Sequence, residues 1–335
     1  MKTVLHLERK FTSKTETFIV NQINTLSRYK AIVGTIRRLD VLPCSAPVIT
    51  PKKISHISKS GRILSRKTAL SLSSSLAPID FSLIHTHYIV DALLFLGLKK
   101  EIEVPKVCSA YGYDVSSFPN HYFGLPKIFY KWVFKEYDYI LAMSEDMKSD
   151  LLRLGCPLQK IRVHYYGTDT ARFICPDRSY KKENKNLKIL SVGTIEEKKA
   201  QHLVVDALNL LRVKHHTENF EYHLVGGGDY QSVIMQQIEK YGLQDKVFVH
   251  GYVPHYSDDL IRHFNSADIF ALTSITLSDN DKEGIPGTIV EAMANGLPIV
   301  STYHAGIPCI IENEKEGLLV EERNVEQLAN ALFGL

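Results

Sequence analysis

Cysteine is scarce in this sequence. Its 335 residues hold five cysteines, an odd number, and none of them has the Cys-x-x-Cys spacing of zinc and redox sites. Long apolar runs are also missing: the longest, residues 89–98, contains Asp91 and is far shorter than the ~20 residues of a membrane-spanning helix. The start of the chain has no apolar stretch of signal-peptide length. We therefore expect a cytoplasmic protein without a disulfide framework.

Charge is unevenly spread along the chain. Residues 1–180 hold 26 Lys and Arg against 15 Asp and Glu, whereas residues 181–335 hold 14 against 22. The composition, 44% hydrophobic and 23% charged, is typical of a globular enzyme and excludes a disordered, collagenous or coiled-coil chain. The length predicts about two domains. Because the two halves carry opposite charge, we expect them to face different partners.

Strand and helix patterns alternate along the carboxy-terminal half. The predicted strands are 187–193, 220–225, 247–249, 269–272 and 297–301, and the predicted helices are 200–214, 230–241, 260–265 and 288–295. Such alternation predicts a parallel sheet covered on both faces, with ligands bound beyond the carboxyl ends of the strands. Glycine breaks fall at such ends, at Gly193, Gly226, Gly251 and Gly284.

The amino-terminal half alternates in the same way. Its predicted elements are strands over 2–7, 31–36, 81–85, 104–109 and 139–143 and a helix near 18–28. Residues 176–186 are polar, lack large aliphatic side chains and are typical of a linker. We therefore expect an α/β protein with a first domain over 1–175, a linker over 176–186 and a second domain over 187–335.

The most specific motif runs from Glu283 through Gly-Ile-Pro-Gly-Thr-Ile-Val to Glu291. A proline near the first helical position and a flexible glycine before it suit a helix start, whose free amides attract a diphosphate. At ~1.5 Å per residue, Glu291 lies ~8 Å into such a helix, where its carboxylate can accept hydrogen bonds from a ribose. On spacing alone, an ordinary strand–helix–strand unit with two surface glutamates fits as well.

This segment resembles the E-x7-E signature of the retaining glycosyltransferases of family 4. That resemblance implies the GT-B architecture, in which two Rossmann-like parallel-sheet domains face each other across a cleft. It also implies that Glu283 contacts the donor sugar and that Glu291 holds the ribose. The other donor-binding positions that the resemblance implies are Gly193, Thr194, Gly226, Gly251, Gly284, Ile285, Pro286 and Gly287.

Residues 192–200 resemble the loop in which the family holds the donor diphosphate with an Arg and a Lys. Lys199 occupies the Lys position, so the resemblance makes Lys199 and Glu283 the catalytic pair. Thr194 stands where the family has Arg, and Ala200 stands where it has Gly. Loss of one cation beside a leaving diphosphate could cost on the order of 10²-fold in rate. If position 200 needs a positive φ, alanine adds ~1 kcal/mol of strain there.

The amino-terminal half carries further family-like segments. Residues 15–23 resemble the entry segment of enzymes that build exopolysaccharide or lipopolysaccharide, and residues 84–88 resemble a His-Ala-His-Phe strand end. Residues 110–115 resemble a His-Gly-Tyr-Asp loop, with Tyr111 in place of its His. The acceptor or cleft residues expected from this resemblance are Thr17, His87, Tyr111 and Asp114. His85 and His87 also fit ordinary hydrogen-bonded histidines at a strand end.

Two motifs are set aside. Asp279-Asn-Asp281 matches the Asp-x-Asp that binds manganese in another glycosyltransferase architecture, but it lies in a loop of the kind where related sequences have acidic insertions. Gly226-Gly-Gly-Asp229 lacks the Gly-x-Gly-x-x-Gly spacing of dinucleotide-binding folds. We therefore expect neither a metal ion nor an organic cofactor.

A basic segment separates Asp40 from Asp80, because no acidic residue lies between them. Its cations over 52–67 alternate with aliphatic residues and permit an amphipathic helix on an anionic membrane surface, at ~1 kcal/mol per cation. A solvated loop fits the same residues. Nucleic acid is not expected as a partner, because the segment lacks aromatic residues and no nucleic-acid-binding module is recognisable.

The sequence, with this resemblance, thus predicts a retaining hexosyltransferase in surface polysaccharide synthesis. We expect its donor to be a UDP-linked nucleotide sugar and its acceptor to be lipid-linked or a saccharide. We expect it in the cytoplasm or on the inner face of the cell membrane. Thr194, Ala200 and Tyr111 also fit an inactive nucleotide-sugar-binding scaffold, and a non-hydrolysing epimerase fits less well. Family members usually continue through further helices after the position of Leu335, so carboxy-terminal helices are expected to be missing.

Overall fold

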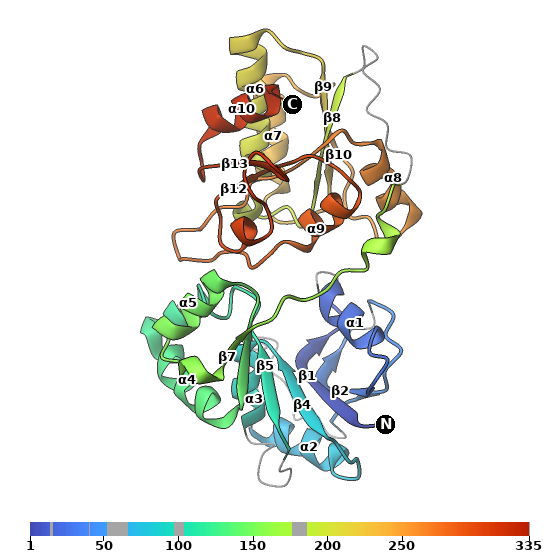
Figure 1. The fold of residues 1–335 in the computed structure, drawn as a ribbon, viewed down its shortest axis with the longest axis vertical. Helices are drawn as coiled ribbons and strands as arrows, with labels where there is room; N and C mark the ends of the chain where they lie inside the picture. The colour runs from blue at the N-terminus through green and yellow to red at the C-terminus, as the bar shows by residue number, and fades with distance from the viewer. Residues whose placement is uncertain (14–15, 40, 52–65, 97–103, 176–185, 335) are drawn as a thin grey trace. The chain divides into compact units, whose positions relative to one another are not determined.

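The computed structural model describes residues 1–335 except 14–15, 40, 52–65, 97–103, 176–185 and 335. The chain divides into two compact units, Met1–Gly167 and Thr168–Leu335, each with one parallel sheet (Figure 1). The expected pair of α/β, Rossmann-like domains is confirmed. No helix within the described residues is long and apolar enough to cross a membrane.

The amino-terminal unit has seven parallel strands in the order β3-β2-β1-β4-β5-β6-β7. The strands are β1 (Thr3–Phe11), β2 (Lys30–Arg38), β3 (Val48–Ile49), β4 (Leu83–His87), β5 (Lys106–Ser109), β6 (Tyr139–Ala142) and β7 (Ile161–Val163). The α-helices are α1 (Thr17–Asn24), α2 (Arg66–Leu76), α3 (Ile89–Phe95), α4 (Leu125–Glu136) and α5 (Glu145–Arg153). Leu5 and Leu7 of the central strand β1 are buried against Leu72 and Leu76 of α2.

Local sequence explains where two of these helices begin. The Ser144 hydroxyl accepts a hydrogen bond from the Met147 amide, and two acidic residues occupy the first turn of α5. Ser144 therefore caps the helix while the carboxylates favour its positive end. Helix α4 follows Gly124, whose φ of 79° suits glycine, and has Pro126 in its first turn.

The carboxy-terminal unit has six parallel strands in the order β10-β9-β8-β11-β12-β13. The strands are β8 (Leu187–Val192), β9 (Phe220–Val225), β10 (Val247–Val249), β11 (Ile269–Leu272), β12 (Ile299–Thr302) and β13 (Gly317–Val320). The α-helices are α6 (Gln201–His215), α7 (Gln231–Tyr241), α8 (Asp258–Ser266), α9 (Gly287–Ala294) and α10 (Val325–Phe333). Strand order reverses between β8 and β11, and ligands bind at such a switch point in open α/β sheets.

The helices of this unit cover its sheet in two groups. One hydrophobic cluster joins α6, α7 and α10, and a second joins α8 and α9 (Figure 1). Burial of both faces explains why the strands read as continuous apolar runs rather than alternating ones. The expected elements 187–193, 220–225 and 269–272 agree with β8, β9 and β11 to within a residue or two.

The boundary between the two units follows Gly167, eight residues before the expected end of the first domain at residue 175. Residues 168–175, assigned above to the first domain, cluster with the carboxy-terminal unit. Phe173 is fully buried there and packs edge-on against Phe264, with ring centroids 5.2 Å apart. Asn295 Nδ2 donates a hydrogen bond of 2.6 Å to the Phe173 carbonyl. The expected linker over 176–186 lies outside the described residues except for Asn186, and the basic segment over 52–65 lies outside them as well.

Replacement of Phe173 tests this packing. We expect Phe173→Ala to lower the free energy of unfolding by ~3–5 kcal/mol, because it leaves a cavity among buried aromatic rings. Ile174→Ala is the matched control, since that side chain is 59% exposed and its loss should cost less than ~0.5 kcal/mol. Urea unfolding followed by circular dichroism measures both. Equal effects would show that residue 173 is not part of this core.

Candidate active site

Lys199 and Glu283 meet although 84 residues separate them. Lys199 ends a short 3-10 helix after β8, and Glu283 lies in the loop between β11 and α9. Because β8 and β11 are neighbours, the two loops lie at the same sheet edge. The Lys199 Nζ to Glu283 Oε2 distance is 3.0 Å, and both side chains are largely buried. The structure thus joins the two residues that the sequence pairs as catalytic.

Glu283 remains ionised in this setting. Burial alone would raise its pKa, but the ammonium groups of Lys199 and Lys198 hold the pKa of Glu283 below its usual value. Lys198 forms its closer ion pair with Asp281, at 3.0 Å, and lies 3.9 Å from Glu283. Glu283 Oε1 is buried and accepts no hydrogen bond from the residues that the structure describes. This is the Glu283 oxygen that lies 3.9 Å from Nζ of Lys198.

The backbone at Glu283 is held by a residue that the sequence analysis did not select. The Glu283 amide donates to Nε2 of His304, at 3.0 Å, and His304 Nδ1 lies 2.6 Å from Oε1 of Glu322. His304 is fully buried. Burial opposes ionisation of Glu322, but hydrogen bonds from His304 and the Thr276 amide lower its pKa to about 2. Its partner Glu322 lies 18 residues further along the chain, so no local motif marked the pair.

Glu291 lies on helix α9, as the spacing predicts. The helix begins at Gly287 with Pro286 as the residue before it, and Glu291 is 3% exposed. Its Oε1 lies 2.7 Å from Nε2 of His255, whereas Oε2 is buried without a hydrogen bond from the described residues. Gly284 accepts a hydrogen bond from the Gly306 amide, and Ile285 is buried. The motif therefore forms one loop-and-helix unit with a free carboxylate oxygen.

Glycine is required where two loops of this unit touch. Gly226 has φ of 144°, and a Cβ there would lie 1.8 Å from the Gly193 carbonyl oxygen. A Cβ at Gly228 would lie 2.3 Å from the Ile195 oxygen. The Gly226 amide also donates to Gly251, at 2.8 Å. The expected donor positions Gly193, Gly226 and Gly251 are therefore adjacent. The backbone at Gly226 is in direct contact with the backbone at Gly193 and Gly251.

Thr194 and Ala200 flank Lys199, and both depart from the family pattern. Thr194 follows Gly193 in this loop, and its carbonyl accepts a hydrogen bond from Gln201 Nε2, at 2.9 Å. Ala200 has φ of 51°, in the left-handed region that favours glycine. Because φ at residue 200 is positive, the backbone strain expected for alanine at this position applies. The Ala200 methyl group is fully buried in the core, and that contact offsets part of the cost.

The candidates of the amino-terminal unit gather at the carboxyl ends of β4 and β5. Nδ1 of His87 lies 2.7 Å from the Tyr111 hydroxyl. Thr17 is the first residue of α1, and its neighbour Phe18 packs on the Tyr111 ring with centroids 4.8 Å apart. Asp114 is different in kind, because its carboxylate accepts three hydrogen bonds from backbone amides and is fully buried. Asp114 shapes the loop that carries Tyr111.

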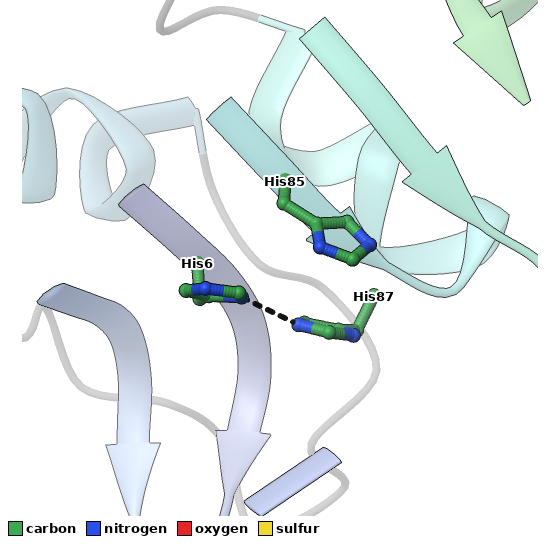
Figure 2. A group of neighbouring side chains, drawn as sticks. All are labelled: His6, His85 and His87. Carbon is green, nitrogen blue, oxygen red and sulfur yellow. Dashed lines mark hydrogen bonds between the residues drawn. The ribbon is translucent and has the colours of Figure 1, made fainter. Parts of the chain in front are cut away.

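Two further histidines surround His87 (Figure 2). His6 of β1 lies opposite His85 of β4 in the sheet register, and Nδ1 of His6 is 3.1 Å from Nε2 of His87. His85 Nε2 lies 2.8 Å from the Ser109 hydroxyl. Burial lowers the pKa of His6 to about 4 and the pKa values of His85 and His87 well below the usual value. The three rings therefore form a neutral network behind Tyr111.

Glu8 is a second residue that the sequence analysis missed. It lies two residues after His6 on β1 and is 2% exposed. Burial and then the nearby Glu16 carboxylate raise the pKa of Glu8 to about 10, so it is protonated at neutral pH. Alternation of His6 and Glu8 with the apolar Leu5 and Leu7 in β1 was the available signal.

Comparison with known proteins identifies the family. Residues 177–333 match the family model described as "Glycosyl transferases group 1", and residues 28–172 match "Glycosyltransferase Family 4". The chain belongs to these glycosyltransferases. Its relatives include the putative colanic acid biosynthesis glycosyltransferase WcaL of Escherichia coli, 38% identical over 224 residues, and the amylovoran biosynthesis glycosyltransferase AmsK of Erwinia amylovora, 33% identical over 256 residues. The aligned parts are 66% and 76% of this chain, and 53% and 61% of those relatives.

Solved structures share the fold along the whole chain. HepE of Anabaena, in complex with UDP, has a TM-score of 0.77 at 18% identity and covers 100% of this chain and 89% of its own. The sucrose-phosphate synthase of Thermosynechococcus elongatus has the same TM-score, identity and coverage. The GT-B fold class expected from the sequence is confirmed. The glycosyltransferase chain spans little more than half of the curated relatives that it matches.

Gly226 provides a test of the close approach between loops. We expect Gly226→Ala to destabilise the protein by more than ~1 kcal/mol, because a Cβ at a positive φ collides with backbone that must move. Gly227→Ala is the control, since its nearest contact would be a side-chain atom 3.9 Å away. Thermal unfolding of both variants measures the difference, and similar melting temperatures would contradict the observed packing.

The partly buried Glu322 carboxylate predicts a pH dependence. Because its folded pKa is depressed to about 2 from 4.5, its contribution to stability is complete above pH ~4.5 and is lost as the pH falls toward 2. Glu322→Gln should remove this part of the acid destabilisation. Urea unfolding at several pH values tests it, with Glu239→Gln on the exposed side of α7 as the control. An unchanged acid profile in Glu322→Gln would refute the assignment.

Proposed function

We propose that this glycosyltransferase moves a hexose from a nucleotide sugar, UDP-linked, to a lipid-linked or saccharide acceptor during synthesis of a surface polysaccharide. The observation that carries the proposal is the convergence of Lys199, Glu283 and the start of α9 at the switch point between β8 and β11. Relatives named for colanic acid and amylovoran synthesis support the polymer, and neighbours solved with UDP and UDP-glucose support the donor.

In this proposal the donor nucleotide lies against the start of α9. The amides of the Gly284–Gly287 segment and the positive end of the helix attract the diphosphate. The free Oε2 of Glu291 accepts hydrogen bonds from the ribose hydroxyls, while His255 fixes its other oxygen. The loops at Gly193, Thr194, Gly226 and Gly251 bring backbone close to the ligand, and the free Oε1 of Glu283 accepts from a hydroxyl of the sugar.

The proposed chemistry is electrostatic. As the bond between the anomeric carbon and the diphosphate oxygen breaks, its electron pair goes to the diphosphate, whose growing charge is stabilised by the Lys199 ammonium group. The acceptor hydroxyl attacks from the face that the diphosphate leaves, so the anomeric configuration is retained, and its proton passes to the diphosphate oxygen. In the free protein Lys199 is held by Glu283, so the ammonium group is already placed when the donor arrives.

For the acceptor we propose the group formed by Thr17, His87, Tyr111 and the loop that Asp114 shapes. Tyr111 offers its hydroxyl, and the neutral, fully buried His87 imidazole 2.7 Å away orients that hydroxyl for recognition of sugar hydroxyls without charge. The basic residues over 52–67 support docking of the protein on an anionic inner membrane surface, a proposal that rests on the sequence alone.

Two substitutions test the donor site. We expect Lys199→Ala and Glu291→Ala each to lower sugar transfer from UDP-glucose at least about 100-fold, because each removes a group that holds the departing nucleotide. Lys214→Ala and Glu326→Ala, at an exposed ion pair on the same unit, should leave it unchanged. Thermal unfolding confirms that each variant is folded. Near-normal transfer by both site variants would refute the assignment.

Calorimetry with UDP separates the enzyme from a scaffold. We propose Thr194, Ala200 and Tyr111 as tolerated departures, so the wild-type protein should bind UDP and also release or transfer glucose. Binding of UDP without either reaction, across saccharide and lipid-linked acceptors, would instead favour the nucleotide-sugar-binding scaffold.

A further inference from the structure

Three histidines line a cavity of about 660 Å³ in the carboxy-terminal unit. Neither Glu283 nor Glu291 is among the residues that line it. His223 lies in β9, His250 follows β10, and His263 lies in α8. Asp259 and Arg262 of α8 complete much of the wall and form an ion pair with each other. The proposed glycosyl transfer uses none of these side chains.

The imidazole nitrogens converge in this cavity. One ring nitrogen from each histidine lies within 4.8 Å of the others. Nδ1 of His223 is 2.9 Å from Nε2 of His250, and the ring centroids of His250 and His263 are 4.4 Å apart. Tetrahedral zinc holds nitrogen ligands at ~2.0–2.1 Å, which places them ~3.3 Å from one another. The His263 nitrogen, which lies within 4.8 Å of the other two, has to move closer to reach that spacing.

The Glu221 carboxylate determines which ring nitrogen of His223 carries the proton. Nε2 of His223 lies 3.4 Å from Oε2 of Glu221, and Glu221 Oε1 accepts from Asn186 at 3.0 Å. His223 therefore carries its proton on Nε2 and turns the lone pair of Nδ1 toward His250. A metal-binding histidine characteristically donates its other ring N–H to such a carboxylate.

We propose that His223, His250 and His263 bind a divalent transition-metal ion, zinc in the first place, and that the ion ties α8 to β9 and to the loop that follows the edge strand β10. Neutral imidazole suits zinc, nickel and copper rather than magnesium or calcium. His250 moves its proton from Nε2 to Nδ1 when Nε2 binds the ion, and water fills the fourth position. The site is structural and independent of the proposed sugar transfer.

The buried histidines of the amino-terminal unit are the competing site. His6, His85 and His87 also have three nitrogens within 4.8 Å of one another. There His87 contacts His6 (Figure 2). His87 also contacts the Tyr111 hydroxyl, and His85 contacts the Ser109 hydroxyl. An ion would have to displace these hydrogen bonds within a core whose three rings are 5% exposed or less. At the cavity an ion would displace the hydrogen bond between His223 and His250, but those two side chains are partly buried and exposed rather than enclosed in a core.

The test uses the whole chain after removal of metal by a chelator. Calorimetric titration with Zn²⁺, and Co²⁺ as a spectroscopic probe, should detect binding in the wild type. We expect His250→Asn and His263→Asn each to weaken Zn²⁺ binding at least tenfold, and Glu221→Gln to weaken it about tenfold by releasing His223. His216→Asn is the control, because His216 is exposed on the same unit and asparagine tolerates its positive φ.

Thermal unfolding gives a second readout that does not depend on activity. Zn²⁺ should raise the melting temperature of the wild type and of His216→Asn, since an ion that binds only the folded state stabilises it. The rise should be absent in His250→Asn and His263→Asn, whose metal-free melting temperatures show whether they fold. Absence of Zn²⁺ binding in the wild type would overturn the proposal. Undiminished binding in both variants would overturn it too, and would direct attention to His6, His85 and His87.

Discussion

The ion pair between Lys199 and Glu283 is the constraint on which the candidate active site depends. Two largely buried charges are stable only as partners, because the loss of either leaves the other unpaired away from water. The pair forms because β8 and β11 are neighbours and parallel, so the loops that follow them leave the sheet at one edge. The sheet order therefore decides which side chains meet, and the loops decide how they are oriented.

The strands named in the sequence analysis, and their parallel direction, followed from simple sequence patterns. Apolar runs such as 187–193 and 269–272, separated by helical spacing, were sufficient to predict β8, β11 and the sheet. The early boundary at Gly167 was not predicted, because the polar stretch 176–186 is conspicuous in the sequence whereas the burial of Phe173 depends on α8, α9 and Asn295. Contacts over more than a hundred residues leave no local pattern.

The candidate site shows the same division. The spacing of Glu283 and Glu291 was readable, because both lie on one loop and helix. His304, Glu322 and the pairing of His6 with His87 were not, since each is defined by a partner on another strand or loop. The histidines of the metal proposal were hidden for the same reason: His223, His250 and His263 come from three elements, and their spacing matches no zinc motif.

The loop around Tyr111 has one property with a wider consequence. Asp114 fixes its backbone by accepting hydrogen bonds from the amides of Ile89, Tyr111 and Gly112, so the path of the chain does not depend on the side chain at position 111. A histidine and a tyrosine can therefore occupy that position on the same scaffold. Exchange of the side chain at this position can then change the chemistry that the loop presents, without rebuilding the surrounding backbone.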